Sequence, residues 1–414
     1  MKQTKQLFFI LLLLPIACSQ KQHENDFDFR YITDLEVVSP KAVKVSVDNF
    51  AKRITLLFER DKDLSKVTLK LTLANGVEMV DPATATATYD LSDKSEILLR
   101  KKGETITFKL LVRYQSAPLT INASDWEKKE DFGALPEYVS VYRYKKNLPG
   151  KSLKVFIAVA ETTGGKARFA LLGEKKGSKT PKQYYQEHFH PVAVMNGGYF
   201  WSNNSLGLMI REGVTLSHAQ PVVNREYNGV QTPYYPTLGA FGLESDGSFT
   251  AQWVYESDNT LYAYPAPSPN KAGDTPQPKP SKSFPEGSVI WQPKEAIGAG
   301  PLLIKNGTYK NLWENELFDE ASGVGPTYNH PRSAIAYHPN GYLVFFVCEG
   351  RNKTPNTPGL SLKEVADLLL SLGCTEAINL DGGGSSCMLI NGKETIIPSD
   401  KNGQRAVTNA VTIY

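Results

Sequence analysis

Asn379-Leu380-Asp381-Gly382-Gly383-Gly384-Ser385-Ser386 is the stretch that decides how this chain folds around its candidate site. Three consecutive glycines permit positive φ angles and let another molecule approach the backbone without meeting a Cβ atom. Asp381 stands at the entrance of this glycine loop, and two hydroxyl side chains stand at its exit. The loop therefore suits contact with the oxygens of an anion or a sugar. A tight structural turn is the alternative that the loop alone leaves open.

A helix and two strands are predicted around the glycine loop. Ser361-Leu362-Lys363-Glu364 has the pattern of a capping box, and apolar residues at helical spacing follow it until Gly373 ends the helix. The short apolar run 375–380 predicts a strand that leads into the loop. A second strand, 387–390, leads out of it into Asn391-Gly392, which is a type I′ hairpin signal.

The first 18 residues have the layout of a secretory signal. Lysines precede the apolar run 7–14, which is too short to cross a bilayer. The residues up to Cys18 resemble a bacterial lipobox, which predicts that Cys18 is lipidated and that 19–28 is a polar tether. We expect an exported lipoprotein held at the membrane of the cell envelope. Ordinary signal-peptide cleavage, with Cys18 incidental, is the alternative.

Composition limits the class of protein. The 414 residues are 41% hydrophobic, which is enough for one large or two moderate cores. The net charge is only +3 and no basic stripe is present, so nucleic acid is not an expected partner. Cys348, Cys374 and Cys387 fit no zinc spacing. They are expected to be small buried side chains, with a single disulfide as the alternative.

The chain is predicted to be mainly β, with two domains. Seven short apolar runs separated by turn signals predict a small immunoglobulin-like β-sandwich over 29–115. Residues 116–133 are predicted to be a linker. Residues 134–414 are predicted to form a larger, β-rich α+β domain with a few helices.

Glycine turns recur through the larger domain. Short hydrophobic hairpins follow the turns at 196–198, 298–300 and 381–384, which predicts a β core with its glycine turns gathered at one end. The first of these turns runs into Tyr199, so an amide lies beside aromatic rings. A sugar site needs that combination, although aromatic residues at turns also serve as core plugs.

Charged residues flank a predicted hairpin. His330-Pro331-Arg332 precedes its first strand and Glu349-Gly350-Arg351 follows its second. The hairpin would bring Arg332 and Arg351 to the same end, where two guanidinium groups can hold a phosphate. Glu349 and Asp381 would form the pair of acids that glycoside cleavage requires. Simple salt bridges among these groups are the alternative. No cofactor is predicted, and a Ca²⁺ ion near Asp381 stays open.

Six motifs, taken in order, resemble the phosphodiester glycosidase family. They are Val194-Met195-Asn196-Gly197-Gly198-Tyr199-Phe200, Gly298-Ala299-Gly300-Pro301-Leu302-Leu303, His330-Pro331-Arg332-Ser333-Ala334, Glu349-Gly350-Arg351, the glycine loop, and Arg405-Ala406-Val407-Thr408-Asn409. The resemblance covers about 135–414. It implies a hydrolase that cleaves the glycosidic C–O bond of a sugar-1-phosphodiester, such as N-acetylglucosamine-1-phosphodiester, and leaves a phosphomonoester. The substrate would be a sugar phosphate or a phosphoglycan.

The resemblance also implies roles for single residues. The active site would be lined by Asn196, Arg332, Glu349, Arg351, Asn379 and Asp381, with Asp381 and Glu349 catalytic. The neighbours predicted to bind substrate in the same motifs are Gly197, Tyr199, His330, Gly382, Gly383, Gly384, Ser385 and Arg405. The N–H groups of the three glycines would form a nest for the phosphate.

Two other functions remain open on the sequence. The protein could bind surface glycans without cleaving them, or it could be a phosphodiesterase that cuts the P–O bond. Neither the sugar nor the aglycone can be read from the residues.

Overall fold

The computed structural model describes residues 30–59, 62–91, 96–114 and 119–414. The predicted signal peptide 1–18, the lipidated Cys18 and the tether 19–28 lie outside the described residues. The chain divides into two compact units, Met1–Tyr114 and Gln115–Tyr414, and each is described by itself.

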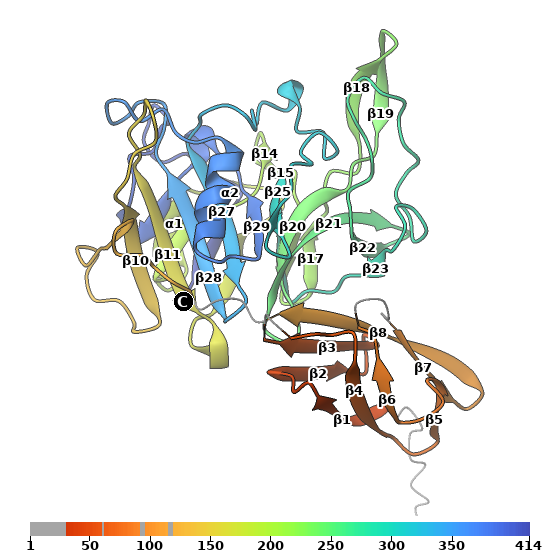
Figure 1. Cartoon of the computed structure of the whole chain (residues 1–414). Helices are drawn as coiled ribbons and strands as arrows, with labels where there is room; N and C mark the ends of the chain where they lie inside the picture. Colours follow the sequence, from red (N-terminus) through yellow and green to blue (C-terminus); the bar gives the residue numbers. More distant parts are fainter. Residues whose placement is uncertain (1–29, 60–61, 92–95, 115–118) are drawn as a thin grey trace, which may run out of the picture. The chain divides into compact units, whose positions relative to one another are not determined.

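The N-terminal unit consists of two sheets that share one hydrophobic core (Figure 1). Its strands are β1 (Ile32–Ser39), β2 (Lys44–Asp48), β3 (Arg53–Phe58), β4 (Val67–Leu73), β5 (Val77–Asp81), β6 (Thr86–Tyr89), β7 (Glu96–Lys101) and β8 (Glu104–Tyr114). The strand order is β1-β4-β6 in one sheet and β2-β3-β8-β7-β5 in the other. Strand β5 was not predicted, because its residues alternate only weakly between buried and exposed. The immunoglobulin-like assignment stays a prediction.

The described part of the larger unit contains three sheets of five or more strands, and every strand pair within them is antiparallel. The eight-stranded sheet has the order β26 (Thr308–Tyr309), β25 (Leu302–Lys305), β29 (Glu376–Asn379), β27 (Arg332–His338), β28 (Tyr342–Cys348), β11 (Val155–Glu161), β10 (Val139–Tyr144), β9 (Trp126–Lys128). The five-stranded sheet has the order β12 (Phe169–Gly173), β32 (Asn409–Ile413), β13 (Ala193–Asn196), β30 (Met388–Ile390), β31 (Lys393–Glu394). The seven-stranded sheet has the order β17 (Val214–Ser217), β16 (Met209–Arg211), β24 (Glu295–Gly298), β20 (Leu238–Leu243), β21 (Phe249–Ser257), β22 (Thr260–Tyr264), β23 (Val289–Ile290). The chain is thus mainly β, as the sequence predicts.

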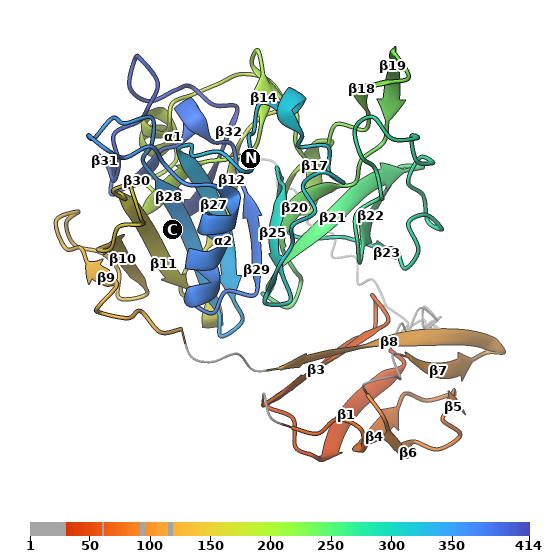
Figure 2. The ribbon, with the colours of Figure 1, turned by 45° about the horizontal axis from the view of Figure 1, so that its top comes forward.

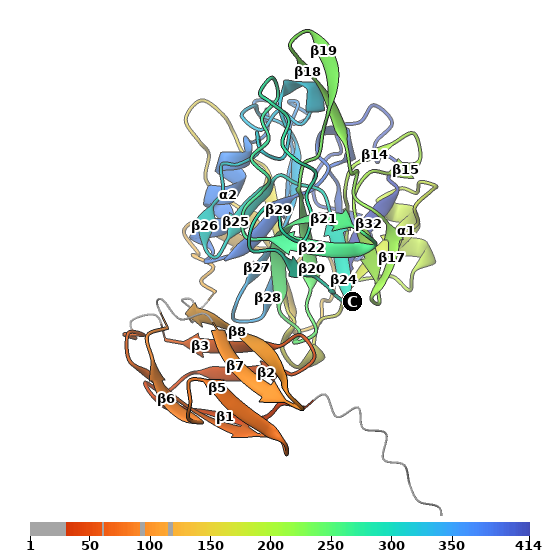
Figure 3. The ribbon, with the colours of Figure 1, turned by 90° about the vertical axis from the view of Figure 1, so that its right-hand side faces the viewer.

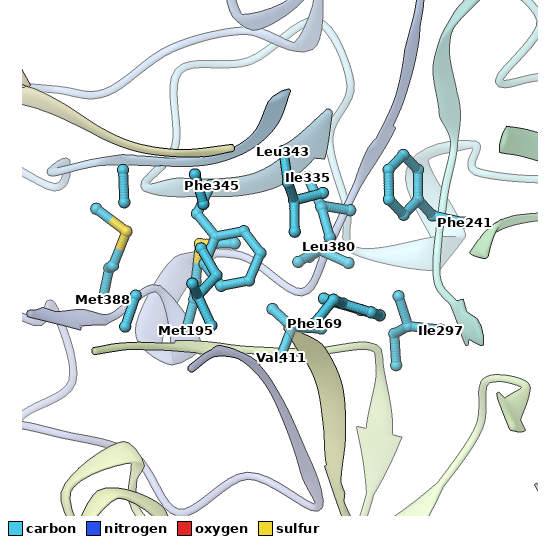
Figure 4. Packing of buried hydrophobic residues seen from close by; sticks show 14 of the residues in the cluster. Phe169, Met195, Phe241, Ile297, Ile335, Leu343, Phe345, Leu380, Met388 and Val411 are labelled. Carbon is cyan, nitrogen blue, oxygen red and sulfur yellow. The ribbon is translucent and has the colours of Figure 1, made fainter. Parts of the chain in front are cut away.

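One core lies among these three sheets. Phe345 from the eight-stranded sheet, Met195 from the five-stranded sheet and Phe241 from the seven-stranded sheet are all fully buried in it. Their side chains point into a shared apolar interior (Figure 4). Strands β27 and β28 are buried along almost their whole length, because a second hydrophobic cluster covers the other face of the eight-stranded sheet. The eight-stranded and seven-stranded sheets lie beside one another (Figure 2).

The two α-helices of the described residues cover outer faces. Helix α2 (Leu362–Ser371) packs against the eight-stranded sheet, and Ser361 and Glu364 form the capping box that the sequence predicts. Helix α1 (Pro181–Glu187) begins at the predicted N-cap, Thr180. Figure 3 shows the two helices on opposite sides of the larger unit. Three short 3-10 helices complete the set, η1 (Thr163–Gly165), η2 (Glu320–Ser322) and η3 (Gly383–Ser385).

Part of the predicted linker 116–133 is instead folded. Residues Trp126–Lys128 form β9, which pairs with β10 at the edge of the eight-stranded sheet. Trp126 is buried and its ring packs edge-on against Tyr144 at a centroid distance of 4.9 Å. Trp126 was the sequence signal for this strand, because burying an indole ring against a sheet is strongly favourable.

Two small hairpins stand apart from the sheets. They are β14 (Phe200–Trp201) with β15 (Asn204–Ser205), and β18 (Val223–Tyr227) with β19 (Val230–Tyr234). Both reach the upper edge of the larger unit in Figure 1. Cys348, Cys374 and Cys387 are buried and free. No helix among the described residues has the length and apolar character needed to cross a bilayer.

Candidate active site

A cavity of about 490 Å³ opens where the glycine turns of the larger unit meet. Its lining includes Gly207, Gly239 and Gly298 from the seven-stranded side together with the three glycines of the glycine loop. Of the three glycine turns that the sequence predicted to gather at one end of the core, those at 298–300 and 381–384 contribute lining residues to this cavity, whereas the glycines of the turn at 196–198 do not. The volume falls in the range of about 300–1,000 Å³ that is usual for small-molecule sites.

Asp381 lies in this cavity, directly after β29. Its N–H donates to the carbonyl of Gly197 at 3.0 Å, and its Oδ1 accepts from the N–H of Gly382 at 2.8 Å. Burial raises the pKa of Asp381 to about 6, although hydrogen bonds from Ser385 and Gly382 and the charge of Arg405 oppose the increase. A carboxyl group with that pKa is half ionised near pH 6 and mostly ionised at neutral pH, so it can exchange a proton in the physiological range.

The three glycines allow two guanidinium groups to lie against the backbone beside Asp381. A Cβ atom on Gly383 would lie 2.7 Å from Nη2 of Arg351, and one on Gly384 would lie 2.2 Å from Nη2 of Arg405. Both distances are shorter than any normal carbon–nitrogen contact. Gly383 also has φ = 59°, which an L side chain rarely adopts. Glycine at positions 383 and 384 is therefore required for the placement of Arg351 and Arg405.

The two guanidinium groups differ in their partners. Arg405 donates from Nε and Nη2 to Asp400 Oδ2, both at 2.8 Å, and from Nη1 to Ser385 Oγ at 3.4 Å. Arg351 is exposed and has a single contact of 3.5 Å, to Ser399 Oγ. Within the described ranges Arg351 has no carboxylate partner, so its donors are available to an anionic ligand.

Glu349 does not line the cavity, which corrects the predicted catalytic pair. Its side chain is fully buried, and its oxygens accept from the N–H groups of Thr354 at 2.7 Å and Ile397 at 2.9 Å. Lys154 forms an ion pair with it at 3.2 Å. Desolvation alone would raise the pKa of Glu349, but the hydrogen bonds and Lys154 outweigh it and lower the pKa. Glu349 therefore holds loops together, and its ion-pair partner is Lys154 instead of the Arg351 considered in the salt-bridge alternative.

Arg332 borders the cavity, but most of its donors are engaged. It is 2% exposed, and its guanidinium donates to the carbonyls of Leu360, Val324, Gly325 and Tyr328. Four of its five N–H groups are thus used within the protein. The prediction that Arg332 and Arg351 together hold a phosphate is therefore wrong for Arg332. Strands β27 and β28 do pair as a hairpin, as the sequence predicts.

The predicted N–H nest is also mostly occupied. Gly382 donates its N–H to Asp381 Oδ1, and Gly383 donates its N–H to the carbonyl of Pro331 at 2.9 Å. These two donors are not free for a phosphate. The loop contributes by placing Arg351 and Arg405 more than by its own N–H groups.

Asn196 and Gly197 support the loop from behind. Asn196 is fully buried; its Nδ2 donates to the carbonyl of Asp381 at 2.6 Å, and its Oδ1 accepts from Ser333 Oγ and the N–H of Cys387. A Cβ on Gly197 would lie 2.0 Å from Asn409 Oδ1. Neither residue lines the cavity, so their predicted contact with substrate is replaced by a positioning role.

The remaining predicted residues meet at the cavity. Tyr199 donates its hydroxyl to the carbonyl of Gly300 at 2.6 Å and accepts from Asn379 Nδ2 at 2.9 Å. His330 lines the cavity, and burial together with Arg332 and Arg351 lowers its pKa. The neutral imidazole can therefore donate and accept hydrogen bonds at neutral pH. Ser385 is 1% exposed and bonds Arg405, so it supports the site from within the loop.

Sequence reasoning missed several lining residues. Glu316 is 1% exposed and accepts from Trp253 Nε1, the N–H of Leu302 and the N–H of Gly239 at 2.7–2.9 Å. Burial raises the pKa of Glu316 to about 7, against those three donors. It lies in an irregular segment without periodicity, so no signal in the sequence identifies it. Trp201, which directly follows the motif that ends at Phe200, also lines the cavity and was not predicted to belong to the site.

A profile of the phosphodiester glycosidase family matches residues 189–414, more than half of the chain. The protein belongs to the phosphodiester glycosidase family. Asp381, Arg351, Arg405 and the glycine loop all fall within the matched segment. Among the described residues, no three His, Cys, Asp or Glu side chains are placed to hold a metal ion.

Relatives match over parts of their length. Mouse N-acetylglucosamine-1-phosphodiester alpha-N-acetylglucosaminidase is 38% identical over 220 residues, which are 50% of this chain and 33% of that protein. The human protein of the same name is 36% identical over 104 residues, 24% of this chain and 20% of the relative. The chain thus spans a third or less of these relatives. The solved zebrafish catalytic domain of that name, auto-inhibited by its pro-peptide, has a TM-score of 0.46 and 16% identity, covering 72% of this chain and 87% of that chain.

Proposed function

We propose that the protein hydrolyses the glycosidic C–O bond of a sugar-1-phosphodiester and leaves a phosphomonoester on the aglycone. The observation that carries the proposal is that Asp381, Arg351 and Arg405 line one cavity, in a member of the phosphodiester glycosidase family. The cavity combines an anion site with a carboxyl group of raised pKa. A phosphodiester of a sugar presents an anion one bond away from its anomeric carbon, so both groups can be engaged at once.

The phosphate is assigned to Arg351 and Arg405. Arg351 is exposed with its donors available, and Arg405 retains donor capacity beyond its bonds to Asp400. The buried, carboxylate-free Arg332 adds positive potential behind them. Charge-assisted hydrogen bonds of this kind contribute roughly 1.5–3 kcal/mol each. They hold the diester and stabilise the charge that the leaving phosphate gains.

Asp381 acts on the anomeric carbon in its ionised form. A phosphate diester leaves readily, so protonation of the leaving oxygen matters less than it does in an ordinary glycoside. The carboxylate either attacks C1 or removes a proton from the attacking water. In the net reaction the oxygen of water bonds to C1, the C1–O bond breaks, and its electron pair goes to the phosphate. Glu316 is the other acid of the cavity lining, but three N–H donors hold its oxygens, so we assign the reaction to Asp381.

Labelled water tests which bond is broken. Incubating the protein with the α-1-phosphate methyl diester of N-acetylglucosamine in H₂¹⁸O should place the label in the released sugar and none in methyl phosphate. Label in the phosphate would show that the protein is a P–O phosphodiesterase. Binding of the diester without any product would favour the glycan-binding alternative.

Export and lipidation of Cys18 remain part of the proposal. The signal layout of residues 1–18 supports them, and mass spectrometry of the mature N-terminus would test them. An acylated Cys18 at the N-terminus is the expected result. An unmodified N-terminus that begins elsewhere would contradict it.

A further inference from the structure

One wall of the cavity is built from apolar side chains. Its members are Phe200, Trp201, Leu206, Ala219, Val223 and Leu238, and all six keep part of their surface exposed. They come from β14, the segment after β15, the segment before β18, β18 itself and the start of β20. We call this set the apolar wall. Figure 2 shows β14 and the β18–β19 hairpin toward the same upper edge of the larger unit.

Trp201 is the member whose exposure most needs an explanation. Its side chain is 77% exposed, and it packs against none of the hydrophobic clusters of the described residues, whereas the adjacent Phe200 packs against one. An exposed indole loses the hydrophobic stabilisation that burial would give it. Unlike the more exposed Phe189, Trp201 lines the cavity, so its ring is available to an apolar group of a ligand bound there.

The hairpin that carries Trp201 is fixed in place. Ser202 and Asn203 both have positive φ, 49° and 54°, which makes a tight two-residue turn. The carbonyl of Asn203 accepts from Gly177, and its Oδ1 accepts from Ser178 Oγ at 2.8 Å. A platform held in this way loses little conformational entropy when a ligand binds.

The apolar wall and its immediate surroundings offer few hydrogen bonds to a ligand. Arg225 lies nearby, but its Nε and Nη2 donate to Asp319 at 2.6 and 2.8 Å and its Nη2 also donates to the carbonyl of Leu317. Gln220 donates its Nε2 to the carbonyl of Val222 at 3.1 Å. A sugar ring needs several hydrogen-bonding partners around its hydroxyls, whereas a hydrocarbon needs none. The chemistry of the wall therefore matches a hydrocarbon better than a second sugar.

We propose that the apolar wall is a subsite for a hydrocarbon chain carried by the phosphate, so that the substrate is a sugar phosphodiester of a lipid-like alcohol. This inference rests on the proposed function, because it takes the phosphate to lie between Arg351 and Arg405. An amphiphile with an anionic head and an apolar tail fits a cavity with one cationic side and one apolar wall. The hydrocarbon remains on the phosphomonoester after cleavage.

The length of the alcohol tests the subsite. We would compare the methyl, butyl and octyl diesters of N-acetylglucosamine α-1-phosphate, together with a diester of the 6-hydroxyl of methyl glucoside. Each methylene that becomes buried is expected to lower KM by roughly threefold to fourfold until the wall is covered. A KM that does not change with chain length, or a glucoside diester that is the best substrate, would overturn the proposal.

Variants connect that trend to the wall. Trp201→Ala should raise KM for the octyl diester by roughly 10-fold or more and leave KM for the methyl diester within twofold. Phe189→Ala is the matched control, because Phe189 is 93% exposed and lies outside the cavity lining. An equal effect of Trp201→Ala on both diesters would show that Trp201 contacts the cleaved sugar and would refute the subsite.

A binding measurement separates this proposal from the proposed function. Octyl phosphate should bind the full chain at least 10-fold more tightly than methyl phosphate in calorimetry, and Trp201→Ala should remove most of that difference. If neither diester is hydrolysed but this difference is observed, the proposed function fails and the hydrocarbon subsite stands. Equal affinities of the two phosphates would refute the subsite even in an active enzyme.

Discussion

Asp381 and Glu349 provide a direct test, because the structure gives two acids that look alike in sequence opposite roles. Burial raises the pKa of Asp381 from 3.8 to about 6, so its ionised form is disfavoured in the folded protein by roughly 3 kcal/mol. The free energy of unfolding therefore falls by this amount as the pH rises from about 4 to about 6, and this contribution is not regained at higher pH. Because Asp381 keeps some exposure to the cavity, we expect about 2–3 kcal/mol.

Asp381→Asn should therefore stabilise the larger unit by about 2–3 kcal/mol at pH 8 and have little effect below pH 4. Asparagine keeps an oxygen for the N–H of Gly382 and cannot ionise. The same substitution should lower kcat/KM by about 100-fold or more, because the reacting carboxylate is lost. A gain in stability with a loss of activity is the expected result for a catalytic group whose ionised form destabilises the folded protein.

Glu349→Gln is the matched control and should give the opposite pattern. The pKa of Glu349 is lowered in the folded state, so its charge stabilises the protein above pH 4.5 and that stability is lost as the pH falls through the folded pKa. Removing the charge breaks its interactions with Thr354, Ile397 and Lys154, and should cost about 3 kcal/mol at pH 7 and less under acidic conditions. The kcat of the folded fraction should remain within a few-fold of the wild type.

Urea unfolding followed by tryptophan fluorescence can measure both effects. All five tryptophans of the chain follow residue 114, so the signal reports the larger unit alone. Lower stability of Asp381→Asn at pH 8, or a difference from wild type that does not change with pH, would refute the description of the Asp381 environment. If Glu349→Gln were as stable as the wild type, the description of the Glu349 environment would be refuted.

Three further predictions concern the cationic side of the cavity and the pH of the reaction. Gly384→Ala should displace Arg405, because the new Cβ would lie 2.2 Å from its Nη2. The kcat/KM should then fall by roughly 10- to 100-fold while the circular dichroism spectrum stays unchanged. Wild-type activity of this variant would refute the steric role of the glycine. Arg351→Ala should raise KM by roughly 10-fold or more without changing the free energy of unfolding. Arg332→Met should instead destabilise the larger unit by about 3 kcal/mol or more, because it leaves four carbonyls without a donor. Similar effects of the two variants on stability would contradict the assignment of Arg351 to the ligand and of Arg332 to the fold. The kcat/KM should rise with pH up to about 6 and then level off, because Asp381 acts when ionised, so a kcat/KM that falls as the pH rises through 6 would assign the carboxyl as a proton donor instead.

Local sequence patterns determined the elements next to the site. The capping box at Ser361, the stop at Gly373 and the hairpin at Asn391-Gly392 all occur where the sequence predicts them, because each depends on a few adjacent residues. The ordered motifs also gave the family, and the pairing of β27 with β28 followed from the length of their hairpin. Asp381 and Arg351 could be assigned to one site on this basis.

Only the tertiary structure decided which charged side chains face the cavity. Glu349 and Arg332 stand in motifs as persuasive as that of Asp381, yet Lys154 and distant N–H groups hold the first and four carbonyls hold the second. Glu316 reaches the cavity from a segment without any periodic pattern. Some of these partners are local, such as Tyr328 for Arg332, but Lys154 and Ile397 lie far from Glu349 in the chain. A buried charge is held by whichever hydrogen bonds the packing brings to it. The sequence by itself determined the elements next to the site, the family and the glycine loop, whereas packing determined which acid and which arginines are free to bind a substrate.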